Sequence, residues 1–329
     1  MIFNLKNISC IYSNSVNPVL KINNLEINEG EIVFIIGASG VGKSTILETL
    51  GVMNQTVKSE KAPWWFFSLL KNIYSSIKDV MNIFGNKKEF NQSILIKSEE
   101  DSFFEFNFED IKENMLDFWN KKESEQAYFR KKYLSFIFQN TNLFPNLNAE
   151  DNVLIAPLLQ GDDIITSKNK SRKIFKQIFT KEYSEILNDK KISEMSGGQR
   201  QRLAFVRAIS THYKILLADE PTGNLDWANA NNLMSHLIID IRDKKSTAIV
   251  VSHDIRLATD HADKIVYIDK IYDKQKKFYY GNISNNNVFV KSKENKWVSI
   301  SPNKLLDKNI KSKELVKFLQ DDIIRKNNI

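Results

Sequence analysis

The chain of 329 residues lacks several features that are typical of disulfide-linked, membrane-spanning or coiled-coil proteins. It has one cysteine, Cys10, which excludes a disulfide framework and suits a reducing compartment. It has no window of about 18 apolar residues, so we expect no transmembrane helix and assign any membrane role to another subunit. Its first residues, MIFNLKNISCIY, start directly as an alternating strand, so we expect no signal peptide. Sustained heptads are also missing, which argues against long coiled coils.

A glycine-rich loop lies between a predicted strand and a predicted helix. The run EIVFII at residues 31–36 is apolar and β-branched, like a buried parallel strand, and ILETL at 46–50 has helical spacing. Between them, GASGVGKST at 37–45 matches G-x-x-x-x-G-K-[ST] in its proper strand–loop–helix context. Its backbone N–H groups would face the phosphates at a helix N-terminus, with Lys43 adding a cation and Ser44 ligating Mg²⁺. The loop predicts a nucleotide site rather than an ordinary glycine turn.

An acidic pair follows a second buried strand. In ILLADE, at residues 215–220, four apolar residues end in Asp219 and Glu220. Ligands bind at the carboxyl edge of such sheets, so Asp219 would hold Mg²⁺ and Glu220 would polarise the attacking water as general base. Alone, such a pair is often only a solvated turn. Together with the lysine loop it predicts a nucleotide site that hydrolyses a phosphate bond.

The order of the motifs identifies a family. GASGVGKST, FIFQ at 136–139, SGGQRQR at 196–202, ILLADEPTGNLD at 215–226 and VSHD at 251–254 resemble an ABC-transporter nucleotide-binding subunit. The similarity covers roughly residues 1–53 and 93–270. It implies an α/β P-loop NTPase fold with a RecA-like core, an antiparallel β subdomain and a helical signature subdomain at about 140–210. It also implies ATP and Mg²⁺ as ligands, and a head-to-tail dimer with a second copy or a paralogous ATPase subunit.

Residue roles follow from this resemblance, position by position. Tyr12 would stack on adenine, Gln139 would sense Mg²⁺ and the γ-phosphate, and His253 would contact the γ-phosphate. Without the family context, Tyr12 could be a strand aromatic packed on the sheet, and His253 a structural histidine. The predicted set is catalytic Glu220, His253, Lys43 and Gln139; Mg²⁺-binding Ser44, Gln139 and Asp219; and ATP-binding Tyr12, Gly37, Ala38, Ser39, Gly40, Val41, Gly42, Lys43, Ser44, Thr45, Ser196, Gly197, Gly198, Gln199 and Asp226. Of these, Ser196, Gly197 and Gly198 would cap the γ-phosphate of the opposite protomer, with Asp226 at the dimer seam.

Two segments indicate a subgroup. ADEPTGNLD, and SFIFQNTNLFPNLNAEDNV at 135–153, resemble the lipoprotein-releasing, MacB and FtsE group. The resemblance implies a separate integral-membrane permease as partner and a peripheral place on the cytoplasmic face of the inner (cell) membrane. Glu194 lies where such subunits contact the permease. The alternative is a soluble ABC ATPase of translation or DNA repair, although those types usually carry two cassettes or long coiled coils.

The first departure from the family is an insertion. Lys43 and Gln139 are 96 positions apart, about twice the usual separation, and the extra residues are roughly 54–92. Residues 93–96 and 102–108 are predicted to form an antiparallel hairpin just after it. Within it, PWWFFSLLKNIYSSIKDVMNIFG at 63–85 predicts an amphipathic helix. That helix could pack on protein or lie among lipid headgroups, where tryptophan is favoured.

The second departure is a basic C-terminal extension, residues 271–329, which follows a nucleotide-binding domain at 1–270. From residue 264 to the end there are 15 Lys and Arg against 7 Asp and Glu. Residues 288–292 and 297–300 predict a hairpin with lysines on its exposed face, and 312–326 predict an amphipathic helix. The charge could attract anionic lipids or be a solvated face. No recognition motif supports nucleic-acid binding.

Overall fold

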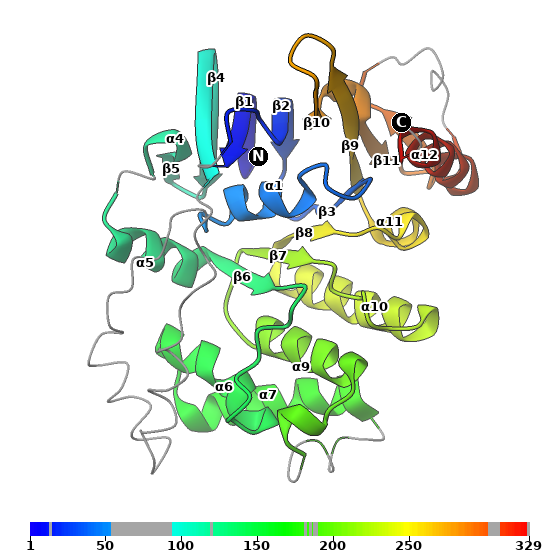
Figure 1. Ribbon diagram of the computed structural model, residues 1–329. Helices are drawn as coiled ribbons and strands as arrows, with labels where there is room; N and C mark the ends of the chain where they lie inside the picture. The colour runs from blue at the N-terminus through cyan, green and yellow to red at the C-terminus, as the bar shows by residue number, and fades with distance from the viewer. Residues whose placement is uncertain are drawn as a thin grey trace.

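The computed structural model describes residues 1–12, 15–53, 94–118, 121–180, 183, 186, 190–301 and 310–327, with the backbone alone for 94–100. The predicted insertion at 54–92 and its helix at 63–85 lie outside these residues. In the described part, one mixed sheet runs through the molecule with helices on both faces (Figure 1). This arrangement is the predicted α/β class.

The centre of the sheet is parallel and buried. β3 (Ile32–Gly37), β8 (Thr247–Val251), β7 (Ile215–Asp219) and β6 (Leu134–Ile137) pair in that order, and β9 (Lys264–Asp273) pairs with the other side of β3. Every residue of β3 and β8 is buried, as expected when helices cover both faces. Because parallel strands end at the same edge, the residues that follow β3, β6, β7 and β8 meet there.

An antiparallel arm continues the sheet beyond β9. β10 (Phe278–Ile283) pairs antiparallel with β9 and parallel with β2 (Leu20–Ile27). β2, β1 (Phe3–Tyr12), β4 (Ile94–Phe108) and β5 (Ile111–Asn114) then follow as antiparallel neighbours. β10 therefore connects the parallel centre to the arm.

Alternate residues of β3 point into two separate cores. Val33 and Ile35 pack with α1 (Lys43–Leu50) and the antiparallel arm, whereas Phe34 and Ile36 pack with helices of the opposite face. The remaining helical elements, in chain order, are α4 (Met115–Phe118), α5 (Glu123–Tyr133), α6 (Ala149–Gln160), α7 (Ile164–Phe179), η2 (Ile192–Glu194), α9 (Gly197–Ile209), α10 (Trp227–Lys244), α11 (Ile255–His261), η3 (Asn285–Asn287) and α12 (Ser312–Asn327). Figure 1 shows α6, α7 and α9 gathered together below β6, within the region predicted as the helical subdomain. No helix in the described ranges combines the length and the apolar character needed to cross a membrane.

The predicted hairpin of residues 93–96 and 102–108 is wrong. Residues 94–108 form one strand, β4, which follows β1 from the Tyr12↔Ile94 pair to the Phe3↔Phe106 pair. The register shifts between the Ile8↔Ser98 and Lys6↔Phe103 pairs, so the chain passes through residues 99–102 without turning back. The hairpin instead joins β4 to β5, since Phe108 pairs with Ile111.

The C-terminal extension completes the sheet and one core. β9 crosses the predicted boundary at residue 270, and β11 (Val288–Lys291) pairs with β9. β11 and β12 (Trp297–Ser299) form the predicted hairpin, which is confirmed, as is the helix predicted at 312–326. Figure 1 shows this helix, α12, beside α11 and β11, and Trp297 and Leu315 are fully buried in the core that α10 and α11 share.

Several lysines of the extension are paired within the chain. Lys291 was predicted on an exposed face, but its Nζ donates to the carbonyl oxygens of Thr259 and Asp260, each at 3.3 Å, at the end of α11. Its backbone N–H also donates to Asp263 O at 2.8 Å. Lys326 forms ion pairs with Asp269 and Asp322. The basic extension is thus attached to the rest of the sheet and to α11 through some of its charged side chains.

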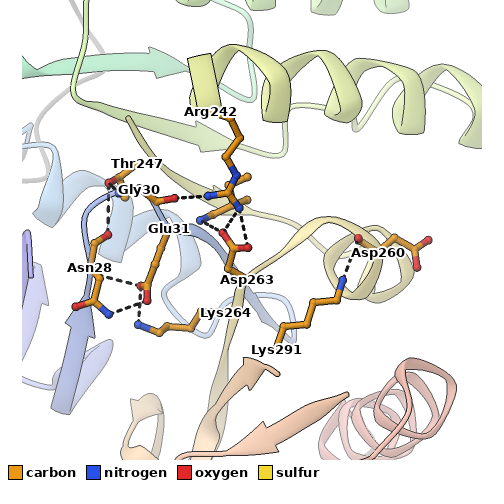
Figure 2. Close-up of polar contacts among 10 residues, drawn as sticks. Asn28, Gly30, Glu31, Arg242, Thr247, Asp260, Asp263, Lys264 and Lys291 are labelled. Carbon is orange, nitrogen blue, oxygen red and sulfur yellow. Dashed lines mark hydrogen bonds and ion pairs between the residues drawn. The ribbon is translucent and has the colours of Figure 1, made fainter. Parts of the chain in front are cut away.

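A polar network ties this attachment to the start of β3 (Figure 2). Lys264, only 3% exposed, donates to Glu31 Oε2 at 2.6 Å. Arg242 donates to both Asp263 carboxylate oxygens and to Gly30 O, which joins the end of α10 to the β2–β3 turn. The network lies at the edge opposite the carboxyl ends of the strands, so it supports the fold rather than the chemistry.

Candidate active site

The predicted phosphate loop joins β3 to α1. Gly42 caps α1 with a φ of 95°, a left-handed conformation that strains residues with a Cβ. Lys43 curls back so that Nζ donates to the carbonyl oxygens of Gly37 at 2.9 Å and Ala38 at 2.8 Å. Burial lowers the pKa of Lys43, and the nearby Glu220 and Asp219 oppose this shift. The first turn of α1 contains no acidic residue, so the helix N-terminus and Lys43 together favour a phosphate.

Asp219 and Glu220 lie where the sequence predicts them. Asp219 is the last residue of β7, and Glu220 N donates to Val251 O at 3.0 Å, at the end of β8. Glu220 has a φ of 46°, and a left-handed conformation in a residue other than glycine costs about 1–3 kcal/mol. Gln201 Nε2, from α9, donates to Glu220 O at 3.3 Å and helps to hold it. The strained backbone places the Glu220 side chain at the strand edge.

Two further predicted residues converge on the Glu220 carboxylate. Gln139, which follows β6, donates from Nε2 to Glu220 Oε2 at 3.3 Å. His253, which follows β8, brings Nδ1 to 3.5 Å from Glu220 Oε1, and its side chain is exposed. The parallel pairing of β6, β7 and β8 therefore brings together three of the four predicted catalytic side chains. A carboxylate held in this way can accept a proton from water.

Ser44 and Asp219 offer suitable donors for Mg²⁺. Burial raises the pKa of Asp219, and Glu220 adds to this, whereas a hydrogen bond from Ser44 and the charge of Lys43 lower it. A hydroxyl and a carboxylate are hard oxygen donors, and Mg²⁺ usually completes its shell with substrate phosphates and water. Gln139, the third predicted ligand, uses its amide nitrogen on Glu220, and its role at the metal stays a prediction.

Tyr12 lies beside the phosphate loop. It ends β1, and its hydroxyl shares a 3.0 Å hydrogen bond with Thr45 Oγ1, at the start of α1. The side chain is partly buried against the core that contains α1, and burial raises its pKa. The structure therefore brings Tyr12 to the loop, and its contact with adenine stays a prediction.

The signature segment forms the N-terminus of α9. Ser196 Oγ accepts from Gln199 N at 3.1 Å, and Gln199 Oε1 accepts from Ser196 N at 3.0 Å, which is a capping box. A hydroxyl that accepts one hydrogen bond can still donate its own proton. Ser196 can therefore cap the helix and also donate to an anion in front of it.

The signature helix packs on the residues that precede α10. A Cβ on Gly198 would lie 3.1 Å from Leu225 Cδ2 and 3.3 Å from Asn224 O, so this close approach depends on the glycine. Asp226 caps α10 by accepting from Asn229 N at 2.9 Å. The exposed Asp226 carboxylate is thus engaged in its own chain, and its place at a dimer seam stays a prediction.

Two side chains of the site were not predicted. Gln201 is fully buried and reaches Glu220 from α9, and the available signal was a polar residue inside a largely buried helix. Glu48, on α1, has its pKa raised by burial and by the charge of Asp219. Glu48 carries no local sequence signal, because only the fold brings α1 beside β7.

Comparisons with known proteins agree with this geometry. A family model described as ABC transporter matches residues 20–223. The lipoprotein-releasing system ATP-binding protein LolD of Pseudoalteromonas translucida is 30% identical over 272 residues, 82% of this chain and 93% of that protein. The macrolide export ATP-binding/permease protein MacB of a Shewanella species is 29% identical, over 76% of this chain and 30% of MacB.

A solved structure is also similar. The dimeric structure of the ATP-binding cassette MJ0796 bound to ADP and Pi matches with a TM-score of 0.58 at 27% identity. The match covers 81% of this chain and 94% of that one. In sequence, the Methanocaldococcus jannaschii protein MJ0796 is 28% identical over 266 residues.

The loop that holds Lys43, the Asp219–Glu220 pair and the residues around them define a P-loop ATPase. With the family match and these relatives, the chain belongs to the ABC transporter family. It is an ATP-binding and ATP-hydrolysing subunit of that family, and the predicted fold class is confirmed.

Proposed function

We propose that the chain powers a separate integral-membrane permease from the cytoplasmic face of the membrane. The names of its relatives support work at a transport system, since LolD is named as the ATP-binding protein of a lipoprotein-releasing system and MacB as an export ATP-binding/permease protein. The observation that carries the enzymatic part is the Glu220 carboxylate held between Gln139 and His253, next to the phosphate loop. The soluble ATPase of translation or DNA repair gains no support from these relatives. The cargo would be recognised by the permease.

In the proposed reaction, Lys43 and the N-terminus of α1 bind the β- and γ-phosphates. A water oxygen attacks the γ-phosphorus, the bond to the β–γ bridging oxygen breaks, and Glu220 accepts the proton of the water. His253 and Gln139 hold the carboxylate and contact the γ-phosphate. Mg²⁺, when bound by Ser44 and Asp219, would neutralise charge on the phosphates.

We infer that the site is completed by a second copy or a paralogous subunit. Among the described residues, Ser196 makes no hydrogen bond with the loop at 37–45 of its own chain, and its helix N-terminus favours an anion. The dimeric cassette structures support the same arrangement. Ser196, Gly197 and Gly198 would then contact a γ-phosphate bound by the partner, with Asp226 at the seam.

The permease is the partner that we propose for the outer surfaces of the chain. Glu194 is exposed at the end of η2, two residues before Ser196. Lys291 and Lys326 of the extension are engaged within the chain, and lipid contact by residues 63–85 or the extension is the weaker proposal. Isolation in detergent tests the permease against the soluble ATPase: a membrane protein that co-purifies supports the permease, whereas ribosomes or DNA support the soluble alternative.

Replacement of Glu220 with Gln tests the enzymatic proposal. Loss of a general base should slow hydrolysis by about 10²–10⁴-fold, and ATP should accumulate in a dimer visible by size-exclusion chromatography. Glu294→Gln is the control, because Glu294 is exposed in the β11–β12 turn and, among the residues that the structure describes, its carboxylate pairs with Lys296 alone. Unchanged steady-state hydrolysis in Glu220→Gln would contradict the assignment.

A further inference from the structure

One strand of the arm lies directly behind the phosphate loop. A Cβ built on Gly281, in β10, would overlap the carbonyl oxygen of Val41 and lie 3.0 Å from its carbonyl carbon. The same Cβ would lie 2.7 Å from Ile268 Cγ2, on β9. Observed Cβ contacts are essentially never shorter than 3.0 Å. Any side chain at position 281 would therefore displace either the loop or the strand.

The strand is not free to move away. Gly281 N donates to Val19 O at 2.9 Å, and Gly281 pairs with Leu20 on β2 and with Lys270 on β9. β10 is thus hydrogen-bonded on both sides along this stretch. Residues 38–42 of the loop belong to no strand or helix, so we expect the loop rather than β10 to be displaced.

Two glycines of the loop meet the same surface. A Cβ on Gly42 would lie 3.1 Å from Leu20 Cβ, and one on Gly37 would lie 2.9 Å from Ile268 O. The back of the loop is therefore enclosed by the start of β2, by β9 and by β10. Its front presents the N–H groups and Lys43 to the phosphates.

We propose that Gly281 is a positioning residue for ATP binding, which supports the backbone of Val41 from behind and so fixes the phosphate-binding N–H groups. The proposal rests on ATP binding at this loop and adds an element that follows the loop by about 240 residues. Because glycine has no side chain, β10 can approach the loop backbone directly, and this close approach supports Val41. Gly281 does not contact the nucleotide.

Gly281→Ala tests the proposal by comparing ATP affinity with stability. We expect the Kd for MgATP and the KM to rise about tenfold or more, with a smaller change in kcat, because overpacking displaces the loop. Phe289→Leu is the control: Phe289 is buried on β11 in the opposite core, so this variant should lower Tm and keep the Kd within about twofold. Wild-type affinity in Gly281→Ala, or an equal loss in Phe289→Leu, would overturn the proposal.

A double variant identifies which contact matters. Ile268→Ala removes the side chain that a new methyl group would meet, but it leaves the Val41 carbonyl in place. Gly281→Ala/Ile268→Ala should therefore bind ATP as weakly as Gly281→Ala, and recovery of affinity would show that the loop backbone is not involved.

Hydrogen exchange tests the same idea in the wild-type chain if Gly281→Ala does not fold. MgATP should slow exchange in β10 at residues 280–282 as well as in the loop, relative to β11. Protection of the loop without β10 would overturn the inference and leave the ATPase assignment standing. Lack of protection at the loop itself would contradict the ATP site.

Discussion

Removal of the Trp297 side chain tests whether the C-terminal extension belongs to the cooperative core of the ATPase. Trp297 is fully buried, and its backbone pairs with Lys291 on β11 and with Ile310 before α12. Its Nε1–H donates to Ser312 Oγ at 3.2 Å, at the start of α12. This one residue, through its backbone and its side chain, thus joins β11, β12 and α12 to the core shared with α10 and α11.

The expected loss is large enough to measure. Trp→Ala in a core costs about 3–5 kcal/mol of unfolding free energy, from lost burial and the cavity left behind. An unfolding entropy of about 2.1 cal/mol/K per residue, over 329 residues, amounts to about 0.7 kcal/mol/K. The Tm of Trp297→Ala should therefore fall by about 4–7 °C.

Calorimetry with and without MgATP measures this shift. Val298→Ala is the control, because Val298 is the next residue of β12 but is 38% exposed, and it should move Tm by a degree or less. The reasoning would be refuted if the main unfolding transition of Trp297→Ala kept its Tm while a small separate transition disappeared. The extension would then be an independent appendage.

Further predictions concern the buried ion pair and the metal site. Glu31→Gln leaves Lys264 buried without its counter-charge and should lower the free energy of unfolding by about 3 kcal/mol. Adding Lys264→Met to the same chain should largely restore this free energy. Urea denaturation that shows the losses of the two substitutions to be additive would contradict the prediction. Burial raises the pKa of Glu31, but hydrogen bonds from Lys264 and Asn28 outweigh it and the net pKa is lowered. The stability that the Glu31 carboxylate contributes is therefore fully present above the pKa of glutamate in the unfolded chain, and it is lost as pH falls through the pKa in the folded chain. The difference in unfolding free energy between the wild type and Glu31→Gln should therefore shrink on acidification. Because the pKa of Asp219 is raised, chiefly by burial, ATPase activity should fall on acidification at a pH above the usual aspartate range. Excess Mg²⁺ should shift this loss of activity to lower pH. A loss of activity that does not shift with Mg²⁺ would count against Asp219 as a ligand.

The features that the sequence predicted are mainly local. The phosphate loop, the acidic pair and the signature segment each depend on a few neighbouring residues between a strand and a helix. The capping box of Ser196 and Gln199 could also be found from its spacing. Parallel strands bring these segments to one edge, so the meeting of Gln139, Glu220 and His253 follows from the fold class.

The features that it missed depend on contacts between distant segments. Residues 97–101 separate the two strands that were predicted to form a hairpin, but backbone pairing with β1 continues there around a register shift. The family resemblance ends near residue 270, whereas β9 continues through this position, and the division of the chain into domains there stays a prediction. Gly281 offered one signal, an isolated glycine in the strand pattern FYYGNI, which often marks the close approach of another backbone.

The central claim is that one chain holds the phosphates while another completes the site. Lys43→Ala and Ser196→Arg should each abolish hydrolysis, but a mixed dimer of the two has one site with both groups intact. An equal mixture should recover about a quarter of wild-type activity, since half of random dimers are mixed and each has one intact site of two. A mixture that stays as inactive as its two components would contradict the account.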